Sequence, residues 1–165
     1  MLTDYVVIDL EMTGLNAKTD RILEATFSEI INPKRELSEK VISLTGITNE
    51  MAVQGKEMDA TLMAFLDFIG EDILVGQNVI FDYSFLKQWA VNHKRTFERN
   101  AVDTLKLARK FLPQEQKKDL ASLCSYFGIE RVHAHRALDD VMETQQIFEQ
   151  LQKMYEAGAP EAFRP

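Results

Sequence analysis

The sequence predicts an α/β sandwich built around a mixed β-sheet. β-rich stretches dominate the first 31 residues, and most later apolar residues recur at helical spacing. A chain of 165 residues with 45% hydrophobic residues is large enough to bury one core, and no internal repeat divides it. Early strands followed by helices therefore favour one compact domain with helices packed on a central sheet.

The expected strands are short and apolar. Residues 6–10 form an apolar run typical of a buried central strand, and residues 22–31 form a longer β-rich stretch that ends at Asn32-Pro33. A further strand is expected at residues 73–75. Residues 43–48 are rich in turn formers, so they predict a connection between these strands.

The expected helices follow from apolar residues at three- and four-residue spacing. They cover residues 62–69, a segment around 85–89, residues 105–112 and 120–127, and a last helix from 136–139 to about 155. Gly70 and Gly128 stand where helices are expected to end, as glycine commonly does. Glycine and proline in the last residues predict a tail or linker stub at 158–165, which leaves residues 1–157 as the expected domain.

Charge and cysteine content exclude several classes of protein. A formal net charge of −7 argues against a protein that coats nucleic acid through a broad basic surface. No apolar run approaches the roughly 18 residues of a membrane span, and the first apolar segment lacks a basic leader. The single cysteine, Cys124, lies in an apolar helical pattern, so it is predicted as a core residue and not as a nucleophile. We expect a cytoplasmic protein without membrane association.

Two carboxylates interrupt the first apolar run. Asp9 and Glu11 are two residues apart, so in an extended strand their side chains point to the same face. Neighbouring buried carboxylates repel each other and lose hydration, and a shared divalent cation offsets both effects. Alternatively, the strand ends at Asp9 and both acids are hydrated in a turn. These residues by themselves leave both interpretations open.

Asp82 shares the apolar face of its predicted helix. It precedes Phe85, Leu86 and Trp89 by three, four and seven residues, which is the spacing of one helical stripe. A buried aspartate needs a partner, such as a cation. The structural alternative is that Asp82 caps the N-terminus of its helix.

The same arithmetic separates Asp139 from Asp140. Asp140 lies on the stripe that continues through Ile147 and Leu151, so it is expected to face the interior. Asp139 lies on the stripe of Glu143, which is expected to face water, and an acid in the first helical turn favours the helix dipole. Only Asp140 therefore needs an explanation beyond local structure.

Two histidines are candidates for a proton-transfer group. His133 and His135 precede the last predicted helix, and a histidine in that loop could reach the same site as Asp140. On one helix His135 and Asp140 would diverge, because each residue turns the helix by about 100°. The residues leave the choice between the histidines open. Asp103, by contrast, is predicted to cap the helix that follows it.

Three segments, in this order, resemble the motifs of the DEDDh, or DnaQ-like, 3′–5′ exonucleases, the family typified by the epsilon proofreading subunit of bacterial DNA polymerase III. They are residues 9–15 (DLEMTGL), 78–86 (NVIFDYSFL) and 135–140 (HRALDD). The resemblance covers nearly the whole chain and selects His135 over His133 and Asp140 over Asp139. It implies a ribonuclease H-like three-layer sandwich, in which a central mixed β-sheet is flanked by helices.

The resemblance also implies a two-metal active site. The residues that would hold two Mg²⁺ or Mn²⁺ ions are Asp9, Glu11, Asp82 and Asp140, and two-metal sites place such ions about 3.5 to 4 Å apart. One ion would activate the attacking water and the other would stabilise the leaving 3′ oxygen. His135 would accept the proton of the water. By the same resemblance, the terminal nucleotide would be contacted by Thr13, Gly14, Leu15, Asn78 and Phe81.

The implied function is metal-dependent 3′–5′ hydrolysis of DNA at single-stranded or frayed ends, which releases nucleoside 5′-monophosphates. Association with a DNA polymerase is a further expectation. One alternative is an exoribonuclease that acts on short or structured RNA, because the metal chemistry neither requires nor forbids a 2′-hydroxyl. The other is a non-catalytic module that binds nucleic acid.

Overall fold

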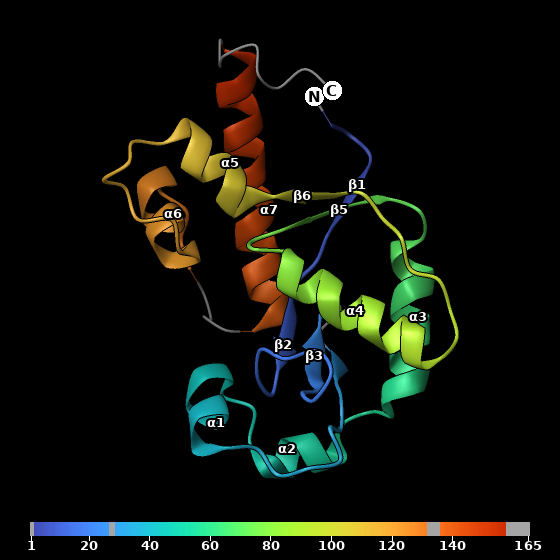
Figure 1. The fold of residues 1–165 in the computed structure, drawn as a ribbon. Coiled ribbons are helices and arrows are strands. Elements are labelled where there is room, and N and C mark those ends of the chain that lie inside the picture. The colour runs from blue at the N-terminus through green and yellow to red at the C-terminus, as the bar shows by residue number, and fades with distance from the viewer. Residues whose placement is uncertain (1, 27–28, 132–135, 158–165) are drawn as a thin grey trace.

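The computed structural model describes residues 2–26, 29–131 and 136–157 (Figure 1). Its central layer consists of two three-stranded sheets, which form a parallel half and an antiparallel half of that layer. In the parallel half, β1 (Tyr5–Val7) pairs with β5 (Ile73–Gly76), which pairs with β6 (Ala101–Asp103). In the antiparallel half, β2 (Leu10–Met12) pairs with β3 (Ile22–Ala25), which pairs with β4 (Glu29–Ile30). The predicted mixed sheet is confirmed.

The apolar run at residues 6–10, predicted as one strand, is divided between the two halves. The backbone N–H of Ile8 still donates to the Val75 carbonyl across the parallel half, at 2.8 Å. The N–H of Asp9 instead donates to the hydroxyl of Thr26 at 2.9 Å, and this hydroxyl donates to the Asp9 carbonyl at 3.1 Å. A side chain thus replaces a backbone partner where the chain changes neighbours, which is why the prediction of a single strand was wrong.

Helices cover both faces of the sheet (Figure 1). The helices on one face are α3 (Met58–Ile69) and α4 (Ile80–Asn92), and those on the other are α5 (Thr104–Phe111), α6 (Leu120–Phe127) and α7 (Ala137–Glu156). Side chains alternate between two cores along the first strands. Ile8 and Leu10 belong to the core under α3 and α4, whereas Val7 belongs to the core under α5 to α7. The predicted three-layer sandwich is confirmed.

Two short helices, α1 (Glu39–Thr45) and α2 (Asn49–Gln54), were not predicted. The expected connection at 43–48 instead contains the end of α1, the left-handed Gly46 and the N-cap of α2, Thr48. Together they cover a small third core, which comprises Leu23, Leu37, Ile47 and Ala52. Helices of six or seven residues are too short for apolar periodicity to reveal them.

The predicted helix ends, the predicted helix cap and the predicted burial of the cysteine are confirmed. Gly70 and Gly128 follow α3 and α6, and Gly128 has a φ of 70°, which glycine adopts without strain. Asp103 caps α5 by accepting a hydrogen bond from the backbone of Leu105. Cys124 is fully buried, and this burial raises the pKa of its thiol to about 12. The last helix has the predicted extent, and the expected tail at 158–165 lies outside the described residues.

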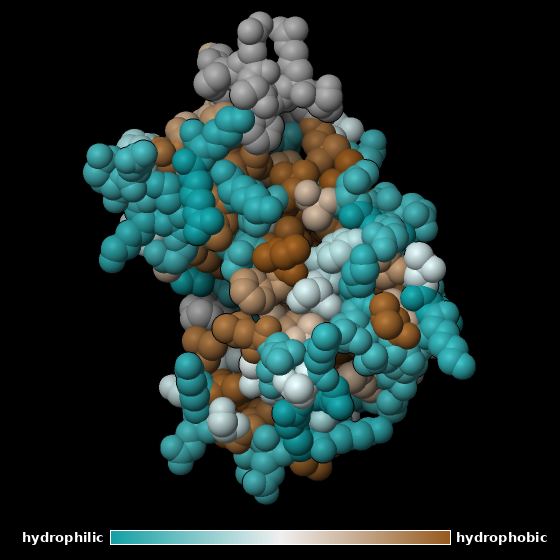
Figure 2. Space-filling view, in the orientation of Figure 1, coloured by the Kyte–Doolittle hydropathy of each residue, from teal (hydrophilic) through white to brown (hydrophobic). Residues whose placement is uncertain are grey.

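The visible face of the molecule is hydrophilic around its periphery, whereas apolar side chains gather toward its upper centre (Figure 2). An apolar groove of about 440 Å³ is lined by residues of α5, α7 and the parallel strands, among them Val102, Leu107, Phe111, Phe148 and Leu151. Among the described helices, none combines the length and the apolar character needed to cross a membrane.

Candidate active site

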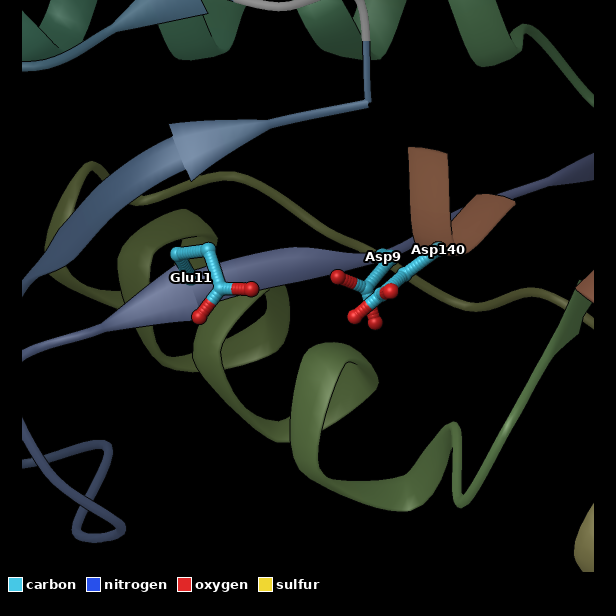
Figure 3. A group of neighbouring side chains, drawn as sticks. All are labelled: Asp9, Glu11 and Asp140. Atoms are coloured by element: carbon cyan, nitrogen blue, oxygen red, sulfur yellow. The ribbon is translucent and has the colours of Figure 1, made fainter. Parts of the chain in front are cut away.

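Three carboxylates from distant parts of the chain meet beside the sheet. Asp9 and Glu11 project from the segment around β2 toward Asp140 in the first turn of α7 (Figure 3). Each offers one oxygen, and the three oxygens lie within 4.8 Å of one another. The shared face predicted for Asp9 and Glu11 brings them together. The prediction that Asp140 faces the interior is confirmed, since this residue is 6% exposed.

Asp82 borders this cluster from the first turn of α4. It is buried, and its Oδ1 accepts a hydrogen bond from the backbone N–H of Leu10 at 2.9 Å. Through this bond Asp82 lies against the backbone between Asp9 and Glu11, and its charge contributes to the raised pKa of Asp9. The alternative that Asp82 caps its helix is wrong, because Val79 is the N-cap and makes no side-chain cap bond.

The electrostatics of these acids fit a divalent cation. Loss of hydration, followed by repulsion from Asp82 and Glu11, raises the pKa of Asp9 well above its usual range. Loss of hydration, followed by the charges of Asp140 and Glu24, raises the pKa of Glu11 to about 8. Burial raises the pKa of Asp82 to about 7, although its backbone hydrogen bonds oppose this shift. Each effect disfavours negative charge, and carboxylate oxygens are the ligands that hard cations such as Mg²⁺ and Mn²⁺ prefer.

The raised pKa values predict that the protein in chelator loses stability as the pH rises. Between the ordinary carboxyl pKa of Glu11, 4.5, and its folded pKa of about 8, the unfolded chain binds fewer protons than the folded chain. Asp82 has the same sign of shift, up to about 7. The free energy of unfolding therefore falls as pH rises through this window. We expect the melting temperature in chelator to be higher at pH 5 than at pH 8.

Two controls sharpen this measurement. Glu11→Gln is expected to reduce the slope of melting temperature against pH, because it removes one titrating group. Saturating Mn²⁺ is expected to remove most of the fall in melting temperature between pH 5 and pH 8, since a cation favours the ionised carboxylates. An identical slope in wild type and Glu11→Gln would contradict the assignment of the pH dependence to this cluster.

Arg131 was not identified from the sequence. Its guanidinium links two carboxylates on α7: Nη2 lies 3.1 Å from Oδ1 of Asp140, and Nε lies 2.8 Å from Oε2 of Glu143. Glu143 is 3% exposed, so the expectation that it faces water was wrong, whereas on the same stripe Asp139 is half-buried and Gln146 is exposed. The physical reason is that α6 packs against this side of α7 and brings Cys124 to 3.6 Å from Glu143.

A second buried ion pair joins the sheet to the start of α7. Glu24 is fully buried on β3, directly opposite Glu11 on β2. It accepts hydrogen bonds from Nε and Nη2 of Arg136, at 3.0 and 2.7 Å, and from the backbone N–H of Ala137 at 3.2 Å. A charged residue inside an apolar β-rich stretch was the available signal for Glu24, and it is the signal that singled out Glu11.

The loop after β2 carries three of the residues assigned to the nucleotide. Asp20 organises this loop by accepting hydrogen bonds from the Thr13 hydroxyl at 3.3 Å and the Asn16 backbone at 3.0 Å. A Cβ on Gly14 would lie 2.5 Å from the Asp20 carboxylate, so glycine fits this position best. Leu15 is 75% exposed at the outer end of the loop. An exposed leucine on an ordered loop is available for contact with a ligand.

The other two residues assigned to the nucleotide lie near the start of α4. Asn78 has a left-handed φ of 60°, which asparagine tolerates, and its N–H donates to Oδ1 of Asp103 at 3.0 Å. Phe81 is half-buried. A groove of about 660 Å³ separates α4 from the loop after β2, and its lining includes Leu15, Lys18, Ser84, Lys87 and Val91. Leu15 lines this groove, whereas Asn78 and Phe81 are not among its lining residues.

Both candidate histidines, His133 and His135, lie outside the described residues. Their assignment stays a prediction from the sequence. The structure therefore describes the four carboxylates and the five residues assigned to the nucleotide, but not the histidine.

Comparisons with known proteins identify a family and close relatives. The profile of the RNase_T family, described as exonuclease, matches residues 6–148. The chain is 34% identical over 157 residues to DNA polymerase III subunit epsilon of Aquifex aeolicus, a match that covers 87% of this chain and 78% of that protein. It is 33% identical over 156 residues to the PolC-type DNA polymerase III of Clostridium perfringens, of which it spans 11%.

Solved structures with this fold include two bound to DNA. The zinc-bound complex of E. coli ExoI with single-stranded DNA has a TM-score of 0.77 at 17% identity, over 95% of this chain and 43% of that one. Exonuclease X in complex with 5′ overhanging duplex DNA has a TM-score of 0.68 at 20% identity, over 93% of both chains. At these identities the likeness shows the fold, which is the predicted ribonuclease H-like fold.

Proposed function

The chain belongs to the exonuclease family whose profile matches residues 6–148, and on this basis we propose that it is a metal-dependent 3′–5′ exonuclease. The observation that carries this proposal is the meeting of Asp9, Glu11 and Asp140, with oxygens within 4.8 Å of one another. Like charges gathered in this way are unfavourable for a purely structural site, but they suit a site that binds cations. We assign the activity to a domain formed by residues 1–157.

Four carboxylates are proposed to hold two divalent cations, Mg²⁺ or Mn²⁺: Asp9, Glu11, Asp82 and Asp140. When bound, the cations supply positive charge that activates the attacking water and stabilises the leaving 3′ oxygen. The chain orients these ligands from three elements. The segment around β2 carries two of them, and the bond from the Leu10 N–H restrains Asp82 on α4. The contacts of Glu24 with Arg136 and Ala137 restrain the start of α7, which carries Asp140.

We further propose that His135 accepts the proton of the attacking water. The ordinary pKa of histidine, near 6.5, suits proton transfer at neutral pH. The support is its place in the third motif, five residues before Asp140.

The proposed substrate is the 3′ end of DNA, either single-stranded or frayed. The names of the similar proteins support this choice, since they include a polymerase III epsilon subunit and two exonucleases bound to DNA. The relatives named as DNA polymerase III proteins support an association with a DNA polymerase. The nucleotide-binding residues proposed for this substrate are Thr13, Gly14, Leu15, Asn78 and Phe81.

Digestion of matched DNA and RNA oligonucleotides, labelled at the 5′ end, tests the proposal. We expect stepwise shortening and release of nucleoside 5′-monophosphates from DNA in Mg²⁺ or Mn²⁺, and no shortening in chelator. Full activity in chelator would contradict the metal-dependent mechanism. Faster cleavage of RNA would identify an exoribonuclease instead. Binding of DNA without cleavage in either metal would identify a non-catalytic module.

Leu15→Ala is expected to raise the KM for single-stranded DNA about tenfold with little change in kcat. Burying a leucine side chain contributes about 1.5–3 kcal/mol, and loss of a contact made equally in the ground and transition states appears in KM. Leu15 is 75% exposed beside the groove, so the protein itself loses little packing. Leu44→Ala is the matched control, because Leu44 on α1 is 51% exposed and does not line that groove. Equal KM values for the two variants would exclude the contact.

A further inference from the structure

We propose that Arg131 is an internal counter-cation of the carboxylate cluster, which neutralises Asp140 until a divalent cation binds and then transfers to Glu143. This inference rests on the proposed binding of cations by Asp9, Glu11 and Asp140. It assigns to Arg131 a positioning role in metal binding and no contact with the reacting atoms.

The first observation is that Arg131 and the proposed cation share a ligand. Nη2 of Arg131 lies 3.1 Å from Oδ1 of Asp140, a residue whose carboxylate also forms the three-oxygen cluster with Asp9 and Glu11. A guanidinium bound there lowers the negative charge that attracts a divalent cation, and its own charge repels one. Binding of Arg131 to Asp140 and binding of a cation to Asp140 therefore oppose each other.

The second observation is that Glu143 has one oxygen available to Arg131. Its Oε2 accepts from Nε of Arg131 at 2.8 Å, whereas Oε1 has no hydrogen-bond partner and is the only such buried side-chain atom in the described part of the chain. Glu143 is almost wholly buried, and a buried carboxylate oxygen without a donor is unfavourable. This oxygen is therefore a favourable acceptor for a further N–H group.

The geometry of the guanidinium connects these two observations. Nε and Nη2 form a fork that matches both oxygens of one carboxylate, and Arg136 uses this fork on Glu24. Arg131 instead donates from Nε to Glu143 and from Nη2 to Asp140, so its two donors bind different carboxylates. Because Nε is already bonded to Glu143, the proposed transfer is a rotation of the guanidinium that carries Nη2 from Asp140 to Oε1 of Glu143. The transfer would free Asp140 for a cation and satisfy the unpartnered oxygen.

Calorimetric titration of the full chain with Mn²⁺, without substrate, tests this inference. We expect Arg131→Gln to lower the Kd for Mn²⁺ about tenfold, because the competing charge is removed. We expect Glu143→Gln to raise the Kd about tenfold, because Arg131 then has no second carboxylate and stays on Asp140. A merely structural role would not shift the affinity in opposite directions. The matched control, Arg109→Gln, alters an exposed arginine on α5 and should leave the Kd unchanged.

The double variant Arg131→Gln/Glu143→Gln completes a double-mutant cycle for the Kd of Mn²⁺. In the absence of Arg131, Glu143→Gln is expected to change the Kd by no more than about threefold, since its effect passes through the arginine. An equal effect of Glu143→Gln in both backgrounds would show direct electrostatics and overturn the inference. If Arg131→Gln alone fails to fold by circular dichroism, the comparison of Glu143→Gln with the double variant, in which the charges of both Arg131 and Glu143 are removed, tests the same competition.

The outcomes separate this inference from the proposed function. If the wild-type chain binds no Mn²⁺, the proposed function fails together with the inference. If the wild type binds Mn²⁺ and Asp9→Asn does not, but Arg131→Gln has the wild-type Kd, then the metal site stands and the counter-cation is excluded.

Discussion

Asp9→Asn is expected to abolish exonuclease activity while it stabilises the protein in chelator. Asparagine keeps the shape of the side chain but removes the charge from a carboxylate whose pKa is raised by lost hydration and by four neighbouring acids, Asp82, Glu11, Asp140 and Glu24. A bound metal contributes several kcal/mol of transition-state stabilisation, and each 1.4 kcal/mol is a factor of about ten in rate, so kcat/KM should fall at least about 1,000-fold.

The opposite signs of these two effects make the prediction specific. A residue that only maintains the fold would lose activity and stability together, whereas relief of repulsion should raise the melting temperature in chelator. Asp4→Asn is the matched control, because Asp4 is an exposed aspartate five residues earlier and should change neither quantity. Retained activity in Asp9→Asn, or a lower melting temperature in chelator, would contradict the assignment.

Arg136→Leu is expected to destabilise the protein by about 3–5 kcal/mol, because it leaves the buried charge of Glu24 without its partner. The substitution removes two of the three hydrogen bonds that Glu24 accepts, because both come from Arg136. The charge of Arg136 also lowers the pKa of Glu11, so its removal would increase repulsion around the cluster. Urea unfolding in chelator measures the change.

The double variant Glu24→Leu/Arg136→Leu is expected to recover much of this stability, because replacing both members of a buried ion pair removes the unpaired charge. Arg109→Leu controls for the loss of an exposed arginine from the surface. A loss below about 1 kcal/mol in Arg136→Leu would show that water or another group solvates Glu24, as happens at exposed ion pairs. The role of the pair in anchoring α7 would then be excluded.

Much of the fold followed from local patterns. Apolar spacing located α3, α6 and α7, and glycine marked the ends of α3 and α6, because these signals depend on one element at a time. The same spacing turned Asp140 inward, and strand alternation placed Asp9 and Glu11 on one face. Helices α1 and α2 escaped prediction because each spans fewer than two turns.

The predictions that the structure contradicts failed for a different reason, because they depended on contacts between distant segments. The strand predicted at 6–10 divides because the hydroxyl of Thr26, 17 residues away, takes over the hydrogen bonds of Asp9. Glu143 was expected in water because periodicity describes one buried stripe, whereas α7 contacts both the sheet and α6. The partners of a charged side chain come from elsewhere in the chain, so no local pattern identified Arg131.

The sequence by itself determined the α/β class, the phase of the long helices and the inward orientation of Asp82 and Asp140. These properties arise from the periods of strand and helix, which each segment carries alone. Only the tertiary structure decided which acids share a site and which cations neutralise them, because that depends on distances between segments up to 131 residues apart, as between Asp9 and Asp140. Charge energies vary steeply with those distances and with burial, and both are set only when the elements pack.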